Sequence, residues 1–306
     1  MLRLYTHPAC LEHDPGRGHP ESPARLQAVL AALDRDRFAP LDRIESPRAS
    51  REALERVHAP AYVARILASA PATGLVQLDE DTYMSPGSAE AALRAAGAVV
   101  AAVDAVLDAS ASRAFCAVRP PGHHATADQA MGFCLFNNVA VGAAHALAEH
   151  GLQRVAIADF DVHHGNGTQD IFAQEPRVLF VSSHQWPLYP GSGAAAETGV
   201  GNLINAPLPP DTGSRAFRQV WEEVLLPRLH AFAPQLLLVS AGFDAHRDDP
   251  LAQLQLETDD YAWLTARLLD VARTHAAGRV VSTLEGGYDL GALAASAAAH
   301  VGALMG

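Results

Sequence analysis

The chain has 306 residues, and its 22 basic side chains are all arginine. The absence of lysine excludes a Walker-type phosphate loop and Schiff-base chemistry, because both depend on a lysine side chain. With 34 acidic residues the formal net charge is −12, which argues against a nucleic-acid partner because binding phosphates requires cationic side chains.

Short apolar runs alternate with amphipathic segments along the chain. The predicted strands are Leu2–His7, Arg113–Val118, Val155–Ala158, Val178–Ser182, Leu236–Ser240 and Val280–Thr283. The predicted helices are Pro23–Asp34, Ala61–Ala68, Pro86–Leu107, Asn138–His150, Ser214–Phe232, Thr258–His275 and Leu290–Ala303. Several strands are almost continuously hydrophobic, which is typical of strands buried on both faces of a parallel sheet. An α/β fold is therefore predicted. No repeat or linker divides the sequence, so we expect one domain over residues 1–306.

Three further features bear on location. The three cysteines are widely spaced and odd in number, which indicates reduced thiols rather than a disulfide framework. The longest apolar stretch, Ala95–Leu107, is interrupted by Asp104 and is too short to span a bilayer. The beginning of the chain lacks the pattern of a signal peptide. We expect a cytoplasmic protein without a membrane partner.

Four predicted strands are followed by loops rich in Gly, His, Asp and Tyr. These loops are Arg119–His124, Asp159–Gly167, Ala241–Asp244 and Leu284–Tyr288. In open parallel sheets, ligand sites form outside the carboxyl ends of the strands. Because scattered core or surface residues would not collect at one edge of a sheet, this placement predicts a functional site there.

The loop after the third predicted strand suggests a metal site. Asp161 and His163 are two residues apart, so their side chains can point the same way on extended backbone. A carboxylate and an imidazole suit zinc, and Asp244 is the natural third ligand. Each aspartate alone could equally be a helix N-cap. A dinuclear centre would require bridging carboxylates, which this stretch does not offer, so a single ion is favoured.

His123 and His124 follow two prolines and a glycine, which hold the chain in a loop. Each histidine needs a partner for its other ring nitrogen, and both Asp159 and Asn166 are candidates. A carboxylate partner favours the imidazolium, whereas an amide partner leaves the ring closer to a usable base. Tyr288 could donate a hydrogen bond to an oxyanion, although for this residue by itself a buried tyrosine with a satisfied hydroxyl is the better explanation. Metal, base and oxyanion donor together describe metal-assisted hydrolysis of a carbonyl compound.

At this point the motifs match a known family almost from end to end. They are Gly18–Glu21, Asp81–Gly87, Arg119–His124, Gly132–Asn138, Asp159–Gly167, Ser240–Asp244 and Glu285–Tyr288. The chain resembles the zinc-dependent histone deacetylase and acetylpolyamine amidohydrolase family, and most closely its bacterial class II-like members. The resemblance implies an arginase-like three-layer α/β/α sandwich with a central, mainly parallel sheet of about eight strands.

The resemblance also implies roles for individual residues. One zinc ion per chain would be held by Asp161, His163 and Asp244. His124 would be the general base and acid, His123 with Asp159 an electrostatic stabiliser, and Tyr288 the oxyanion donor. Asn166 stands where class I enzymes carry Asp, which supports the class II-like assignment. The tunnel for the acyl-lysine stem would include Gly132, Phe133 and Tyr189, with Leu251 at its rim. Arg25 would be the buried arginine behind the active site.

Family members also bind potassium. Here the resemblance implies a site formed by the Asp159 side chain, backbone carbonyls of Asp161 and His163, and Ser182 with Ser183. A second, weaker monovalent site would lie near Phe172 and Val178.

The expected substrate is an acylated amine, with acyl-lysine side chains preferred and acetylpolyamines second. Leu251 replaces a glutamate that reads a distant ammonium in a polyamine-selective member, although Asp79, Glu80 and Asp81 could supply negative charge at the rim. A dinuclear manganese ureohydrolase and a catalytically silent acyl-lysine binder are the competing hypotheses. The sequence does not determine acyl length, physiological substrate or oligomeric state, and a homo-oligomer is possible.

Overall fold

The computed structural model describes residues 1–306 and is built on an eight-stranded sheet. The strand order is β2-β1-β5-β10-β9-β6-β7-β8. All neighbouring strands pair in parallel. The strands are β1 (Leu2–Thr6), β2 (Asp42–Glu45), β5 (Arg113–Cys116), β6 (Val155–Asp159), β7 (Val178–Gln185), β8 (Leu203–Leu208), β9 (Leu236–Ala241) and β10 (Val280–Leu284). A separate antiparallel pair joins β3 (Val76–Gln77) to β4 (Tyr83–Met84).

The six strands that the sequence predicted are all present, and two more lie at the edges of the sheet. Strands β6, β7 and β9 are buried at every position, as their apolar runs indicated. The edge strands β2 and β8 were not predicted. β2 carries one apolar residue, Ile44, among three charged ones, and β8 contains Asn205 and Pro207. Charged residues and proline are tolerated at an edge, where one side of the strand is unpaired.

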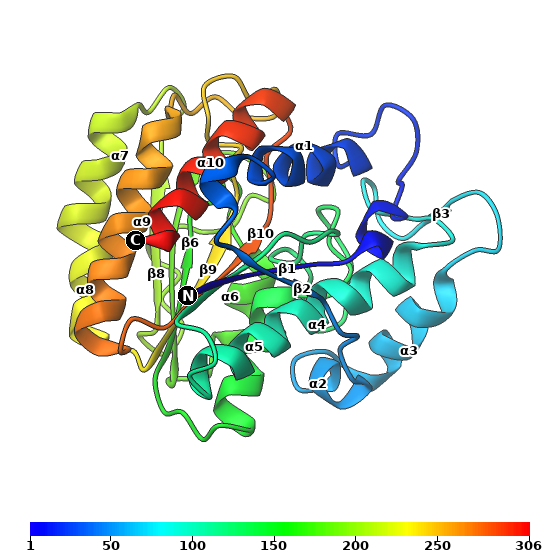
Figure 1. The fold of residues 1–306 in the computed structure, drawn as a ribbon, viewed down its shortest axis with the longest axis horizontal. Helices are drawn as coiled ribbons and strands as arrows, with labels where there is room; N and C mark the ends of the chain where they lie inside the picture. The colour runs from blue at the N-terminus through cyan, green and yellow to red at the C-terminus, as the bar shows by residue number, and fades with distance from the viewer.

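Helices cover both faces of the sheet, which confirms the predicted three-layer α/β/α sandwich (Figure 1). One layer holds α2 (Arg51–Glu55), α3 (Pro60–Ser69), α4 (Ser88–Leu107), α5 (Asn138–Ala148) and α6 (Asn166–Phe172). The other holds α1 (Pro23–Leu33), α7 (Ser214–Val220), α8 (Leu226–Phe232), α9 (Thr258–His275) and α10 (Leu290–Met305). Two short 3₁₀ turns, η1 (Pro8–Leu11) and η2 (Asp36–Phe38), complete the N-terminal part.

The helix predicted as one segment over Ser214–Phe232 is divided. A π-helical turn, η3 (Trp221–Leu225), separates α7 from α8. Pro227 lies just after this turn and has no N–H for the usual helical bond, so the register changes there. The widened turn places Trp221 in the core, where its Nε1 donates to the Ser183 hydroxyl at 3.1 Å.

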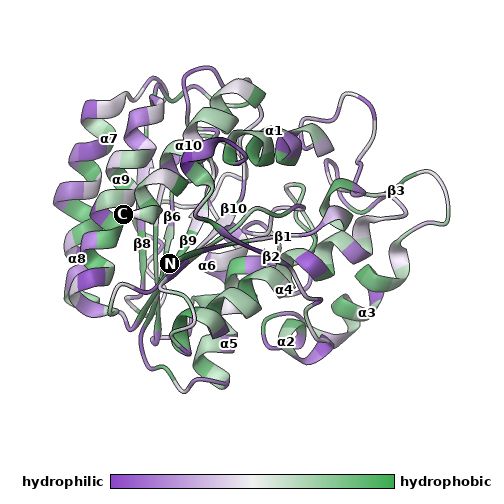
Figure 2. Cartoon of the chain, viewed as in Figure 1, coloured by the Kyte–Doolittle hydropathy of each residue, from purple (hydrophilic) through white to green (hydrophobic).

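A single cluster of 86 buried residues fills both sides of the sheet. Figure 2 shows α5 as mostly hydrophobic, whereas α8 and α9 alternate hydrophilic and hydrophobic residues because one face of each meets water. None of the helices combines the length and apolar character needed to cross a membrane.

The sheet order decides where the polar loops meet. The four strands that precede them, β5, β10, β9 and β6, are consecutive neighbours in the middle of the sheet. Asp159 at the end of β6 is in register with Ser240 of β9, and Leu284 of β10 with Ala241. Because the strands are parallel, all four loops leave the sheet at the same edge and lie side by side.

Candidate functional site

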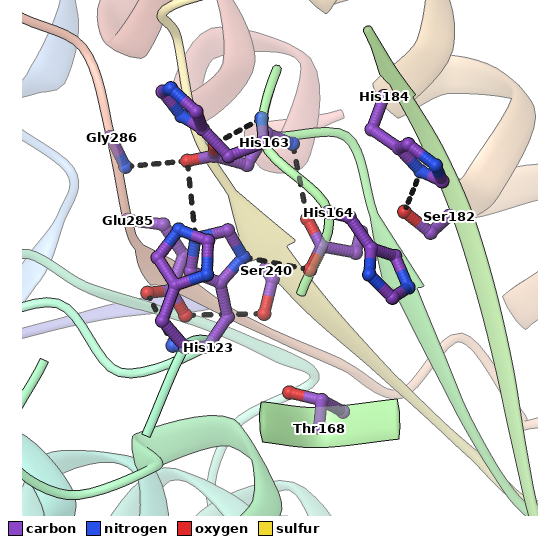
Figure 3. A network of polar contacts seen from close by, with 12 residues as sticks. His123, His163, His164, Thr168, Ser182, His184, Ser240, Glu285 and Gly286 are labelled. Carbon is purple, nitrogen blue, oxygen red and sulfur yellow. Dashed lines mark hydrogen bonds and ion pairs between the residues drawn. The ribbon is translucent and has the colours of Figure 1, made fainter. Parts of the chain in front are cut away.

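Asp161, His163 and Asp244 form a buried cluster at this edge of the sheet. The Nδ1 atom of His163 lies 3.1 Å from Oδ1 of Asp161 and 3.2 Å from Oδ2 of Asp244. Backbone N–H groups orient both carboxylates. Val162 donates to Asp244 at 2.9 Å, and Gly286 donates to Asp161 at 2.8 Å (Figure 3). The three predicted metal ligands therefore converge on one point.

The electrostatics of this cluster fit a cation. Burial by itself lowers the pKa of His163, but hydrogen bonds to Asp161 and Asp244 and their charges raise it to about 10. Burial and the charge of Asp161 raise the pKa of Asp244. A Cβ atom added at Gly286 would overlap Oδ2 of Asp244, so only glycine leaves room for the carboxylates. A site with two carboxylates and one imidazole suits a zinc ion with an open coordination position.

A second group of possible ligands behaves differently. Asp104, near the C-terminal end of α4, lies beside His145 of α5 and His150, which follows α5. The Nε2 atoms of His145 and His150 are 2.6 and 2.7 Å from Oδ1 of Asp104. However, the Arg56 guanidinium donates to Nδ1 of His145 at 3.2 Å. That contact places the proton of His145 on Nε2, so this nitrogen donates to Asp104 and has no lone pair for a metal.

His123 and His124 lie against the metal cluster with different partners. Nδ1 of His123 is 3.0 Å from Asp159, and Nδ1 of His124 is 2.7 Å from Oδ1 of Asn166. Burial lowers the pKa of His123, but the charges of Asp161 and Asp159 outweigh it and raise that pKa to about 10. Burial, followed by the charges of His123 and His163, holds the pKa of His124 well below its usual range. Of the two, His124 is the ring that stays neutral, with one ring nitrogen free to accept a proton.

Tyr288 lies in the loop between β10 and α10. Its hydroxyl stays protonated, because burial raises its pKa well above the usual value. The Arg25 guanidinium lies 4.8 Å from the centre of the Tyr288 ring and donates to the carbonyls of Gly287 and Glu285 at 2.6 and 2.5 Å. Arg25 thus holds the loop from behind, and it is fully buried, as the family resemblance implied.

The predicted tunnel residues line one cavity of about 230 Å³. Its wall consists of Asp81, His124, Gly132, Phe133, His163, Leu188, Tyr189, Leu251 and Tyr288. The Phe133 ring meets that of Tyr288 edge-on at 5.8 Å, and the Tyr189 ring meets that of His124 at 5.2 Å. One cavity therefore joins the apolar residues expected to hold a substrate stem to the imidazoles and the phenol.

The tunnel wall at Gly132 and Phe133 has unusual backbone, with φ of 55° and 68°. A Cβ atom at Gly132 would overlap the His124 ring, which explains glycine there. The turn between β3 and β4 holds this conformation, since Gly132 N donates to Asp81 Oδ1 at 3.1 Å and Phe133 N donates to the Thr82 hydroxyl at 3.0 Å. Asp81 is thereby part of the wall and not only a solvated rim residue.

Comparison with known proteins assigns the family. Residues 19–304 match the histone deacetylase domain. The chain belongs to the histone deacetylase family. Histone deacetylase 14 of Arabidopsis thaliana chloroplasts is 40% identical over 99% of this chain and 76% of its own length. A histone deacetylase-like amidohydrolase of Pseudomonas aeruginosa is 44% identical over 89% of this chain and 73% of that protein. The crystal structure of the HDA15 HD domain matches with a TM-score of 0.93 and 35% identity, covering 99% of this chain and 88% of that one.

The resemblance inferred from the motifs is confirmed, and membership in a family of deacetylases and amidohydrolases supports a hydrolytic activity. The same membership fits the metal requirement suggested by Asp161, His163 and Asp244.

The structure of this histone deacetylase family member brings only some of the predicted potassium ligands close to one another. Asp159 and Ser182 are in register on neighbouring strands. The hydroxyl of Ser182 meets His184 Nδ1 at 2.9 Å (Figure 3). The hydroxyl of Ser183 faces the opposite side of β7 and accepts from Trp221, so only its backbone could serve a cation near Asp159. Potassium binding stays a prediction.

The expected second monovalent site meets a competing contact. The Asn202 amide donates to the carbonyls of Phe172 and Val178 at 2.8 and 2.9 Å, and to that of Glu175 at 3.1 Å. Each of these carbonyl oxygens keeps a second lone pair, so the second monovalent site stays a prediction.

Several residues of the site were not predicted from the sequence. Leu188 lines the cavity, and the buried carboxylate of Asp249 accepts from the backbone of Tyr288. The buried carboxylate of Glu285 accepts from the backbone of Gly122 at 2.7 Å and from that of His123 at 3.2 Å (Figure 3). Glu285 stood inside a recognised motif, whereas nothing local distinguishes Asp249 from the solvated Asp248 beside it.

Proposed function

We propose that this chain is a zinc-dependent hydrolase that removes acetyl or other short acyl groups from acylated amines, preferably from acyl-lysine side chains. The observation that carries the proposal is the convergence of three metal-ligand side chains, a neutral histidine and a protonated tyrosine on one cavity with aromatic walls. Its three cysteines are all free and buried, in keeping with action in the reducing cytoplasm.

In the proposed mechanism each residue at the cavity has a separate role. Asp161, His163 and Asp244 would hold the ion, and zinc in such a site acidifies water and polarises a carbonyl. His124 accepts the proton of the attacking water through its free ring nitrogen, because Nδ1 faces Asn166. Tyr288 donates its hydroxyl hydrogen to the oxygen of the former carbonyl.

The C–N bond then breaks, His124 returns its proton to the leaving amine, and the acyl group leaves as a carboxylate. His123 stays protonated beside Asp159 and balances the negative charge that develops nearby. Phe133 and Tyr189 enclose the aliphatic stem of the substrate and keep water from the amide.

The cavity wall favours an acyl-lysine over an acylated polyamine. Leu188 and Leu251 are apolar, and the Oδ1 atom of Asp81 already accepts from Gly132 and from the Thr82 hydroxyl. Asp81 is the single carboxylate on this wall, and its hydrogen bonds hold it in place there, so a second ammonium group would meet one negative charge among otherwise apolar and aromatic side chains. A dinuclear manganese centre lacks a bridging carboxylate, since Asp159 is engaged by His123.

The test combines metal analysis with turnover. The purified protein should carry one zinc per chain and hydrolyse an acetyl-lysine peptide faster than an acetylated polyamine. Tyr288→Phe should retain zinc and lose about a hundredfold or more in kcat, the usual cost of removing an oxyanion donor. Tyr83→Phe, which removes a phenol outside the cavity wall, is the matched control. Two manganese ions per chain, or full activity in Tyr288→Phe, would contradict the proposal, and faster polyamine turnover would reverse the substrate preference.

A further inference from the structure

Asp249 is a buried carboxylate that links two walls of the cavity. It follows β9 by eight residues and is 6% exposed. Its Oδ1 atom accepts from the backbone N–H of Leu251 at 3.0 Å. Its Oδ2 atom accepts from the backbone N–H of Tyr288 at 2.7 Å and from that of Asp289 at 3.4 Å. One side chain therefore holds the backbone of the rim and the backbone of the tyrosine.

The backbone of Tyr288 is held by Asp249, whereas the residues before it in the loop have hydrogen-bond partners elsewhere. It lies outside β10 and α10 and makes no hydrogen bond to another backbone group. The other residues of its loop are held elsewhere, since Gly286 N donates to Asp161 and the Gly287 carbonyl accepts from Arg25. Asp249 is thus the group that hydrogen-bonds the Tyr288 backbone directly, while Arg25 holds the preceding residue, Gly287.

We propose that Asp249 is a positioning residue for Tyr288. This inference rests on the proposed function and adds a residue to it that does not itself touch the substrate. Hydrogen bonds to a carboxylate are about twice as strong as neutral ones. Removing Asp249 leaves the Tyr288 N–H without a partner and lets the ring shift. A displacement of about 1 Å at a reacting centre can cost about a hundredfold in rate.

A double-mutant cycle tests the proposal. Asp249→Ala and Asp249→Asn are each made in the wild type and in Tyr288→Phe, with zinc content and KM measured alongside kcat. With Tyr288 present, Asp249→Ala should lower kcat about tenfold or more, and Asp249→Asn less because one acceptor oxygen remains. In the Tyr288→Phe background both should change kcat less than about twofold, because residues that act as a unit are not additive.

Equal losses in the two backgrounds would overturn the proposal, because Asp249 would then act independently of Tyr288. A change confined to KM would also overturn it and assign Asp249 to the rim at Leu251. The matched control is Asp260→Asn. Asp260 is likewise a buried carboxylate that accepts from a backbone N–H, that of Glu257 at 2.8 Å, but it lies at the start of α9. This control should lower stability while its effect on kcat stays the same in both backgrounds.

A crystal structure of Asp249→Asn or Asp249→Ala gives a second readout that needs no turnover. The Tyr288 ring should leave its wild-type position while Asp161, His163 and Asp244 stay in place. An unmoved ring would overturn the positioning role. Wild-type protein that fails to hydrolyse any acylated amine would instead overturn the proposed function, and the crystallographic result would still decide the role of Asp249.

Discussion

The rings of His123 and His124 lie 4.0 Å apart between their centres, yet their Nδ1 atoms face groups of different charge. His123 meets the carboxylate of Asp159 and His124 meets the amide of Asn166. The carboxylate favours the charged imidazole, whereas the amide leaves its neighbour subject to burial and to repulsion by the first ring. Two adjacent histidines thereby acquire opposite protonation states, which fits one stabiliser and one base.

Replacing Asn166, the hydrogen-bond partner of His124, should shift the pH dependence of activity. In Asn166→Asp a carboxylate faces His124 and favours its imidazolium, so the pKa of His124 rises. Because the proposed base must be neutral, activity should be lost at a higher pH as the solution is acidified. The acidic limb of kcat/KM against pH should move upward by about one unit, comparable to the effect of one nearby opposite charge. Gln153→Glu adds the same charge at an exposed position and should leave the profile unchanged; an unshifted profile in Asn166→Asp would argue against His124 as the base.

The two groups of possible metal ligands should respond differently to loss of a histidine. His163→Ala should abolish stoichiometric zinc binding and activity, because a zinc site with two protein ligands is incomplete. His145→Ala should keep one zinc per chain and near wild-type turnover, since Arg56 and Asp104 already satisfy both nitrogens of that ring. Elemental analysis after gel filtration measures both. Loss of zinc in His145→Ala would show that the peripheral group also binds the metal.

A buried ion cluster behind Tyr288 should contribute strongly to stability. Glu21 accepts from Arg25 at 2.9 Å and from Arg119 at 2.5 and 2.6 Å, with all three side chains fully buried. Glu21→Gln leaves buried guanidinium charge uncompensated and should cost about 3–5 kcal/mol in the free energy of unfolding. Glu90→Gln is the matched control, because Glu90 also accepts from two arginines, Arg48 and Arg94, but is partly exposed. It should cost less than about 1 kcal/mol in the same urea titration.

The lowered pKa of Glu21 predicts how the stability of the protein changes with pH. Burial raises the pKa of Glu21, but the charges of Arg119, His13 and Arg25 outweigh burial and hold it well below the usual range. The folded state therefore binds this proton less readily than the unfolded state. The stabilisation is fully present above about pH 4.3, the ordinary value for glutamate, and is lost as the pH falls further. Acid unfolding of Glu21→Gln should be less steep than that of the wild type; equal steepness would contradict this assignment.

Gly286 should be intolerant of a methyl group. A Cβ atom there would overlap Oδ2 of Asp244 and press on Oδ2 of Asp161, so Gly286→Ala should displace both carboxylates. Zinc affinity should fall about tenfold or more, the usual cost of disturbing the groups around metal ligands. Gly302→Ala on the exposed side of α10 meets no neighbour and should raise stability by about 0.4–1 kcal/mol. Unchanged zinc affinity in Gly286→Ala would mean that the loop can move.

The sequence by itself determined the layered α/β class, the family and the polar loops that form the candidate site. The central strands are apolar on both faces, and their polar loops are contiguous stretches such as Arg119–His124, so both signals are local. The edge strand β2 escaped prediction because tertiary pairing with β1, more than its composition, makes it a strand.

Only the tertiary structure decided which residues meet. The sheet order makes β5, β10, β9 and β6 neighbours, and this brings Asp244 beside His163 across 81 residues. Asp249 illustrates the limit most clearly, since its partner Tyr288 is 39 residues away and its own neighbours carry no signal of the contact. Residue type and periodicity record burial and chemistry locally, whereas register and strand order arise from packing of the whole sheet.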